Sequence, residues 1–111
     1  MDNLTVKQLQ HYLEQKYKET GVTESLFMKL VEEIGEVAEV RNQIQGRKKK
    51  TSDNSLADEL ADVIHYTFAI AALNHIDLET AIFEKDKKGS LKYKQSPNLS
   101  EYLSKNSVKQ A

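Results

Sequence analysis

Two segments of the sequence carry acidic residues at the spacing of one helical turn. Glu33 and Glu36 are three residues apart, and so are Glu59 and Asp62. On a helix that advances about 100° per residue, each pair lies inside or at the edge of an apolar stripe. A carboxylate at the margin of a core is costly unless it is paired or binds a cation. These four carboxylates therefore predict a divalent-cation site.

The available ligand types favour a hard cation. The chain has no cysteine, so thiolate ligands are excluded. Two acid pairs that face each other across antiparallel helices would supply the oxygen ligands that Mg²⁺ prefers, with Mn²⁺ as the second choice. Arg41 could neutralise one acid of the first pair, but no lysine or arginine lies between residues 56 and 74 to neutralise the second.

The simpler alternative is a solvated, glutamate-rich helix face with lysine and arginine partners. Glu32 and Glu39 fit it, because both project away from the apolar stripe. Two observations favour the cation site. The acids are not confined to the polar face, and the second pair lies on the most apolar of the predicted helices.

Four helices are needed to position these residues, and helical periodicity together with capping signals predicts them. Thr23, Ser55 or Asn54, and Asp77 are the expected N-caps of the last three helices. Gly21, Gly46 and Gly89 are the expected stops. The helices are predicted at about residues 5–19, 23–45, 56–74 and 77–88.

The apolar residues of these helices predict an all-α, four-helix-bundle-like subunit with antiparallel helices, because strand signals are absent. The segment 63–73 is apolar on nearly every side and should form the buried centre. A single domain is expected over residues 1–93, followed by a polar tail over 94–111 with one short turn near 99–103. The inward positions of the other helices are predicted to be Val6, Leu9, Leu13 and Lys16 or Tyr17, then Leu26, Leu30, Ile34, Val37 and Ile44, then Leu78, Ala81 and Ile82.

Composition and net charge indicate which partners and which location to expect. A chain of 111 residues with 39% hydrophobic residues has a limited core, which oligomerisation can complete. The 16 lysines and arginines nearly balance the 17 acids, so the net charge gives no reason to expect nucleic acid or a membrane surface as partner. No apolar run has the length of a signal peptide core or a membrane span, and a cytoplasmic location is expected.

At this point the motifs match a family pattern. Residues 32–36 (EEIGE) followed by 59–62 (ELAD) resemble the EExxE…ExxD signature of the MazG-like nucleotide pyrophosphohydrolases, all-α enzymes that cleave a nucleoside triphosphate to the monophosphate and pyrophosphate. Segments 29–31 (KLV), 62–66 (DVIHY) and 76–81 (IDLETA) extend the resemblance, which covers about residues 26–93. It implies Mg²⁺ dependence, assembly as a homodimer or homotetramer, and a metal-binding set of Glu33, Glu36, Glu59 and Asp62.

The same resemblance suggests further catalytic and substrate-binding residues. Glu32 matches the first acid of the signature. Tyr66 projects on the side of the second acid pair, where its hydroxyl could reach a phosphate; the alternative is a core tyrosine. Lys85, Lys88, Lys92 and Tyr93 resemble the basic stretch that meets the triphosphate, although Gly89 and Lys92 stand where Asn and Arg are common; a solvated helix end is the alternative.

Other residues and other functions remain open. The run Arg47–Lys50 is either a solvated loop or a phosphate-attracting lid. His11, His65 and His75 are expected to be structural. A di-iron carboxylate bundle would need two Glu-x-x-His pairs, and only Asp62 with His65 approaches one. A non-catalytic helical interaction module is the alternative from another class. The nucleotide base is not predicted, because residues 20–23 do not match those of deoxycytidine-specific relatives.

Overall fold

A computed structural model describes residues 3–46 and 55–107, and every regular element in these ranges is a helix. The predicted all-α class is confirmed. The helices are α1 (Val6–Tyr17), α2 (Thr23–Ile44), α3 (Leu56–Leu73), α4 (Leu78–Lys92) and α5 (Leu99–Ser107). They form two compact units, residues 1–76 and 77–111. In these described ranges, no helix combines the length and apolar character needed to span a bilayer.

Helix α1 begins at a capping box. The Thr5 hydroxyl accepts a hydrogen bond from the backbone N–H of Gln8, and the Gln8 side chain accepts one from the backbone N–H of Thr5. Leu13 is completely buried, as its place in the apolar stripe predicted. The turn after the helix is tight because the Gly21 N–H donates to the carbonyl of Tyr17 at 2.7 Å.

Helix α2 differs in detail from its prediction. Its N-cap is Val22, which has no side-chain cap, and Thr23 is already the first helical residue. Its end is as expected, with Gly46 in the left-handed region at φ 74°. Ile34 and Ile44 are exposed, whereas the unpredicted Val40 is buried. The covered face is rotated toward Glu33, so Ile34 lies beyond its edge. Ile44 points in the same direction as Leu26 and is exposed in the last turn of the helix.

Helix α3 begins at Ser55, as expected, through a capping box with Asp58. It ends in a Schellman motif in which His75 adopts φ 55° and the N–H of Ile76 donates to the carbonyl of Ala71 at 3.0 Å. The side chain of Gln10 on α1 donates to the carbonyl of Ile76. This contact links α1 to the turn that follows α3.

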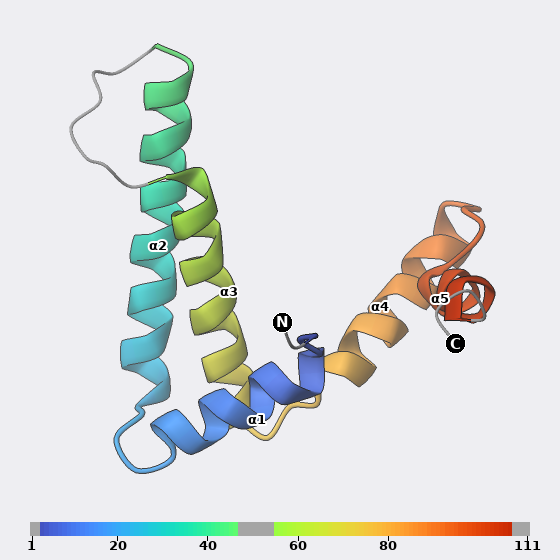
Figure 1. Ribbon diagram of the computed structural model, residues 1–111, viewed down its shortest axis with the longest axis horizontal. Helices are drawn as coiled ribbons and strands as arrows, with labels where there is room; N and C mark the ends of the chain where they lie inside the picture. The colour runs from blue at the N-terminus through green and yellow to red at the C-terminus, as the bar shows by residue number, and fades with distance from the viewer. Residues whose placement is uncertain (1–2, 47–54, 108–111) are drawn as a thin grey trace. The chain divides into compact units, whose positions relative to one another are not determined.

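The first unit is an antiparallel pair of α2 and α3 with α1 crossing it. Figure 1 shows α1 at the end of the pair where α2 begins and α3 finishes. Three alanines of α3 are buried there, which allows the helices to approach closely. Most larger apolar residues of α3 are only half-buried. The core of this unit therefore consists of Leu13, Leu26, Val40, Ala69, Ala71 and Ala72.

The second unit contains α4 and α5. Asp77 caps α4, as predicted, by accepting from the N–H of Thr80. The prediction that Gly89 stops this helix was wrong, because α4 continues to Lys92 and carries the glycine in its last turn. Ala81 and Ile82 are exposed rather than inward.

Helix α5 is longer than the short turn predicted near residues 99–103. Its first N–H, that of Leu99, donates to Asp86 Oδ2 on α4 at 2.6 Å. The charged acceptor satisfies a backbone donor that the start of a helix leaves unpaired. No residue of α4 is buried.

Candidate metal centre

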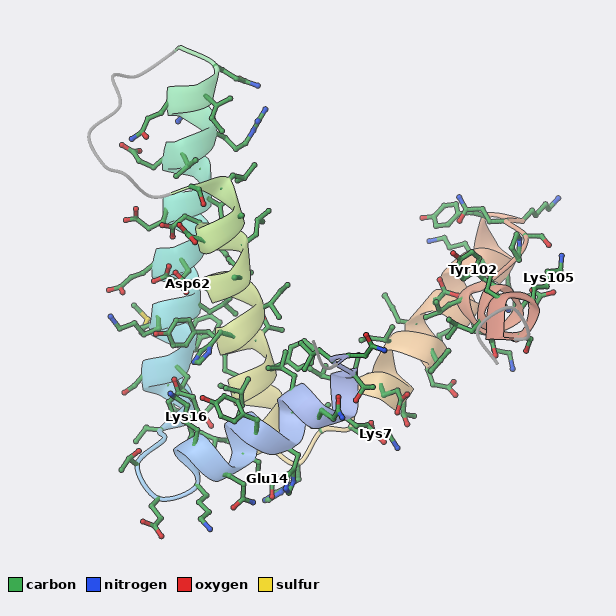
Figure 2. All side chains as sticks on the ribbon, in the orientation of Figure 1. Lys7, Glu14, Lys16, Asp62, Tyr102 and Lys105 are labelled. Carbon is green, nitrogen blue, oxygen red and sulfur yellow. The ribbon has the colours of Figure 1, made fainter. Side chains whose placement is uncertain are left out.

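Three of the predicted acids come together between α2 and α3. Carboxylate oxygens of Glu33, Glu59 and Asp62 all lie within 4.8 Å of one another, and we call this group the carboxylate cluster. Glu33 sits on the covered face of α2, while Glu59 and Asp62 are one turn apart on α3. Figure 2 shows Asp62 where α3 runs beside α2. The facing arrangement expected from the acid spacing is present for these three residues.

The three residues of the carboxylate cluster differ in solvent exposure. Glu59 is only 2% exposed, Glu33 is half-buried, and Asp62 is exposed. A buried carboxylate such as Glu59 requires a proton, a cation or hydrogen-bond donors nearby. The exposed side at Asp62 leaves solvent access to the oxygens. An ion can therefore enter from solvent at Asp62 and contact the buried carboxylate of Glu59.

The electrostatics of the cluster favour a positive ligand. Burial raises the pKa of Glu33, and a hydrogen bond with Glu59 and the charge of Asp62 raise it further. A hydrogen bond between two carboxyl groups requires that one of them keeps its proton. A divalent cation would replace that proton and relieve the repulsion. The donor set, which consists only of carboxylate oxygen, fits Mg²⁺ or Mn²⁺.

The other acids of α2 lie outside the carboxylate cluster. Glu36 is exposed. Glu32 is also exposed, and its carboxylate lies 3.3 Å from the ammonium group of Lys29. This contact raises the pKa of Lys29. Glu39, which was expected to be solvated on the polar face, is half-buried.

Tyr66 lies one turn after Asp62, is half-buried, and stands against a neighbouring ring. The His65 and Tyr66 ring centroids are 4.9 Å apart at 72°. His65 Nε2 is also 2.7 Å from the hydroxyl oxygen of Tyr17 on α1. Burial and the charge of Lys16 lower the pKa of His65, while Asp62 opposes them. The sequence placed Tyr17 in the stripe of α1, but no local signal indicated its contact with His65.

The predicted phosphate-binding residues lie in the second unit. Lys85, Lys88, Lys92 and Tyr93 are all exposed. The ammonium group of Lys92 is 5.3 Å from the centroid of the Tyr93 ring. Lys85 also lines an open groove with Ala81, Ile82 and Asp86. These cations are therefore accessible to an anion. The run Arg47–Lys50 lies outside the described residues.

The di-iron alternative finds no support in the geometry. It requires histidine nitrogen beside the carboxylates, but the group that could hold a metal in the described part of the chain contains Glu33, Glu59 and Asp62 alone. The His65 nitrogen that the hydrogen bond engages faces Tyr17 instead. An oxygen-only site is typical of proteins that bind Mg²⁺ with a phosphorylated ligand.

Comparison with known proteins identifies the family of this helical domain. A model of the MazG nucleotide pyrophosphohydrolase domain family matches residues 22–94. The chain belongs to this family. Its fold is similar to a crystal structure of iMazG from Vibrio DAT 722, with a TM-score of 0.60 and 28% identity over 83% of this chain and 100% of that one. No curated protein matches the chain.

Proposed function

We propose that the protein is a Mg²⁺-dependent nucleoside triphosphate pyrophosphohydrolase, which converts a (d)NTP and water to the (d)NMP and pyrophosphate. The observation that carries this proposal is the carboxylate cluster, which stands between the two helices of a MazG family domain. Mn²⁺ is a possible substitute because it takes the same oxygen ligands. We further propose a cytoplasmic location and a role in clearing unwanted nucleotides.

Glu33, Glu59 and Asp62 are the proposed metal ligands, since their oxygens already converge. Glu36 is proposed as a fourth, because it is one helical turn after Glu33 and a change of rotamer can bring its carboxylate nearer. When bound, the cation would neutralise phosphate charge and lower the pKa of a bound water. A carboxylate not engaged with metal, for which Glu32 is the candidate, would accept the proton of that water.

Five further residues are proposed to bind the substrate. The Tyr66 hydroxyl is a candidate donor to a phosphate oxygen, because this residue follows Asp62 by one turn. Lys85, Lys88 and Lys92, with Tyr93 beside them, would contact the triphosphate, since charge-assisted hydrogen bonds to phosphate are strong. The proposed enzyme would work as a homodimer or homotetramer.

The decisive experiment identifies the released product. The full chain is incubated with Mg²⁺ and each member of a panel of canonical and modified NTPs and dNTPs, and pyrophosphate and orthophosphate are measured separately. We expect pyrophosphate from at least one nucleotide and no release in EDTA. Orthophosphate alone, or full activity in EDTA, would overturn the proposal.

A metal-binding control checks the same site without turnover. Mg²⁺ should raise the melting temperature of the parent protein, because a ligand that binds only the folded state stabilises it. The gain should disappear in Asp62→Asn and remain in Glu24→Gln, which changes an exposed acid of α2 outside the cluster. An equal gain in both variants would place the cation elsewhere.

A further inference from the structure

The hydroxyl of Tyr17 reaches from α1 to the helix that carries two acids of the carboxylate cluster. Its oxygen lies 2.7 Å from Nε2 of His65, which is 48 residues away in the sequence. Both side chains are half-buried, so water competes less with this hydrogen bond than it would at an open surface. The bond is therefore a specific tertiary link between α1 and α3.

The link continues from His65 to Tyr66. Consecutive residues on a helix point about 100° apart, so their rings meet only when both side chains turn toward each other. Here the rings stand edge to face, with centroids 4.9 Å apart. Tyr17 also contacts His65 in an edge-to-face geometry, at 5.7 Å and 81°. The imidazole thus contacts both phenol rings, and its hydrogen bond to Tyr17 restricts its rotation.

The backbone beneath Tyr17 is fixed as well. A Cβ added to Gly21 would lie 2.7 Å from the carbonyl oxygen of Tyr17 and 2.7 Å from Leu73 Cδ1. Only glycine permits this close approach. In the same helix, Leu13 is completely buried. The backbone at the end of α1 is therefore held close to Leu73 of α3.

From these contacts we infer that Tyr17 is a positioning residue, which orients Tyr66 through His65 and so makes α1 part of the active site. This inference rests on the proposed function, in which Tyr66 contacts the substrate phosphates. Tyr17 and the rest of α1 lie outside residues 22–94, which the family model matches. His65 then serves as the connection between the two tyrosines rather than as a ligand of a metal.

The test is a double-mutant cycle on pyrophosphate release with Mg²⁺ and the best nucleotide substrate. Tyr17→Phe keeps the ring and removes the hydroxyl, and it should lower kcat/KM by between about twofold and tenfold, the range expected for one hydrogen bond. In a Tyr66→Phe background the same change should have no further effect. Tyr12→Phe is the matched control, because Tyr12 is an exposed tyrosine of the same helix.

Equal losses in the two backgrounds, or no loss in either, would overturn the inference, because Tyr17 would then act independently of Tyr66 or not at all. His65→Gln is a second variant, which removes the ring contact but keeps a group that can hydrogen-bond to Tyr17. It should also lower kcat/KM only where Tyr66 is intact. A loss that persists in Tyr66→Phe would count against the connection.

An NMR measurement separates this inference from the proposed function. The ring proton resonances of Tyr66 should shift in Tyr17→Phe and stay in place in Tyr12→Phe. If they stay in place in both, Tyr17 does not orient Tyr66. If no triphosphate yields pyrophosphate with the parent protein, the proposed function fails, and these resonances still decide whether Tyr17 positions Tyr66.

Discussion

At the scale of single residues, the main feature is a group of three carboxylates that lie close enough for their charges to repel. Glu33, Glu59 and Asp62 converge within 4.8 Å although only Asp62 is exposed. Such a group is unfavourable for stability alone, and perturbed carboxylates of this kind concentrate at functional sites. The local cost is understandable if the acids are needed to bind a cation.

Replacing a cluster acid by its amide should abolish turnover. Glu33→Gln, Glu59→Gln and Asp62→Asn each remove one ligand charge with little change of shape, so activity should fall below about a tenth of the parent's, a barrier increase above roughly 1.4 kcal/mol. Pyrophosphate release under saturating Mg²⁺ measures it. Glu24→Gln should stay near the parent. Retention of more than a tenth of the activity by Asp62→Asn would remove the cluster from the mechanism.

The raised pKa of Glu33 gives a stability prediction with a definite sign. A carboxyl group whose folded-state pKa lies above its usual 4.5 binds its proton more tightly when the protein is folded. Ionisation therefore costs stability as pH rises through this window. In EDTA at neutral pH, Glu33→Gln should melt at a higher temperature than the parent, and the gap should close as pH falls below about 4.5.

Mg²⁺ supplies the control for this prediction. At neutral pH the cation should stabilise the parent and reverse the order of the two melting temperatures, since the variant lacks a ligand. Thermal melts over a pH series, with EDTA or with Mg²⁺, give both comparisons. A variant that melts below the parent in EDTA at neutral pH would show that Glu33 contributes a stabilising contact instead of a repulsion.

The sequence identified the cluster better than it identified the neighbouring acids. Glu33 could be found because it interrupts an apolar stripe, and Glu59 and Asp62 because they begin an apolar helix. Glu39 could not be placed, since helical periodicity gives a direction but not which neighbours cover it, and this residue is half-buried. The Tyr17 contact with His65 was equally hidden, because it depends on how α1 crosses α3.

At the scale of elements, the turn between α1 and α2 has a strict steric requirement. Gly21→Ala would place a Cβ 2.7 Å from the backbone carbonyl oxygen of Tyr17, so the chain must shift. We expect a loss of about 1–3 kcal/mol in the free energy of unfolding, as for other overpacked sites. Chemical denaturation measures this loss, and unchanged stability would mean that the turn has another low-energy form.

Gly35 is the matched control for this variant. It lies inside α2, and a Cβ there would meet nothing within 4 Å. Gly35→Ala should therefore stabilise the protein by roughly 0.5–1 kcal/mol, because alanine favours a helix over glycine. Opposite signs for the two substitutions would separate the steric requirement at residue 21 from the general preference for alanine.

The helix boundaries show which local signals can be trusted. Hydroxyl and carboxyl caps at Thr5, Ser55 and Asp77 are used, because each satisfies a backbone N–H that would otherwise be unpaired. Gly89 was misleading as a stop, since a glycine inside a helix costs only about 1 kcal/mol and the chain can continue past it. For α5 only a short turn was predicted, although a local capping box was present: Asn98 accepts from the N–H of Glu101, and the Glu101 side chain accepts from the N–H of Asn98.

At the scale of the whole molecule, the described residues bury little large apolar surface. Three of the six buried apolar residues are alanines, and Leu13 is the only large side chain that is less than 2% exposed. Small chains with limited cores commonly gain stability from a partner. Large apolar side chains remain exposed on α2 and α3, including Phe27, Val31, Ile34, Leu60 and Ile64.

These exposed residues have a common direction. Each of Ile34, Leu60 and Ile64 follows by one position a residue on the covered face of its helix. In an antiparallel pair whose helices face each other, a step of one residue turns both side chains toward the same side. Glu33 lies beside Glu59 and Asp62. Ile34 and Leu60, one position after Glu33 and Glu59, are therefore expected at the same level on that side of the pair. The five residues therefore form one apolar surface along α2 and α3.

Self-association should cover this apolar surface. A second α2–α3 pair offers a surface of the same kind, and two pairs together would make a four-helix arrangement in which both are buried. Light scattering at micromolar concentration should report a multiple of 12.7 kDa.

Ile64→Lys should shift the protein toward the monomer with its helical circular dichroism retained, because a lysine in the contact would have to be desolvated. Leu4→Lys, at a residue 71% exposed and outside α2 and α3, should leave the mass unchanged. A compact monomer of the parent chain under these conditions would contradict the prediction and leave the exposed surface to another partner.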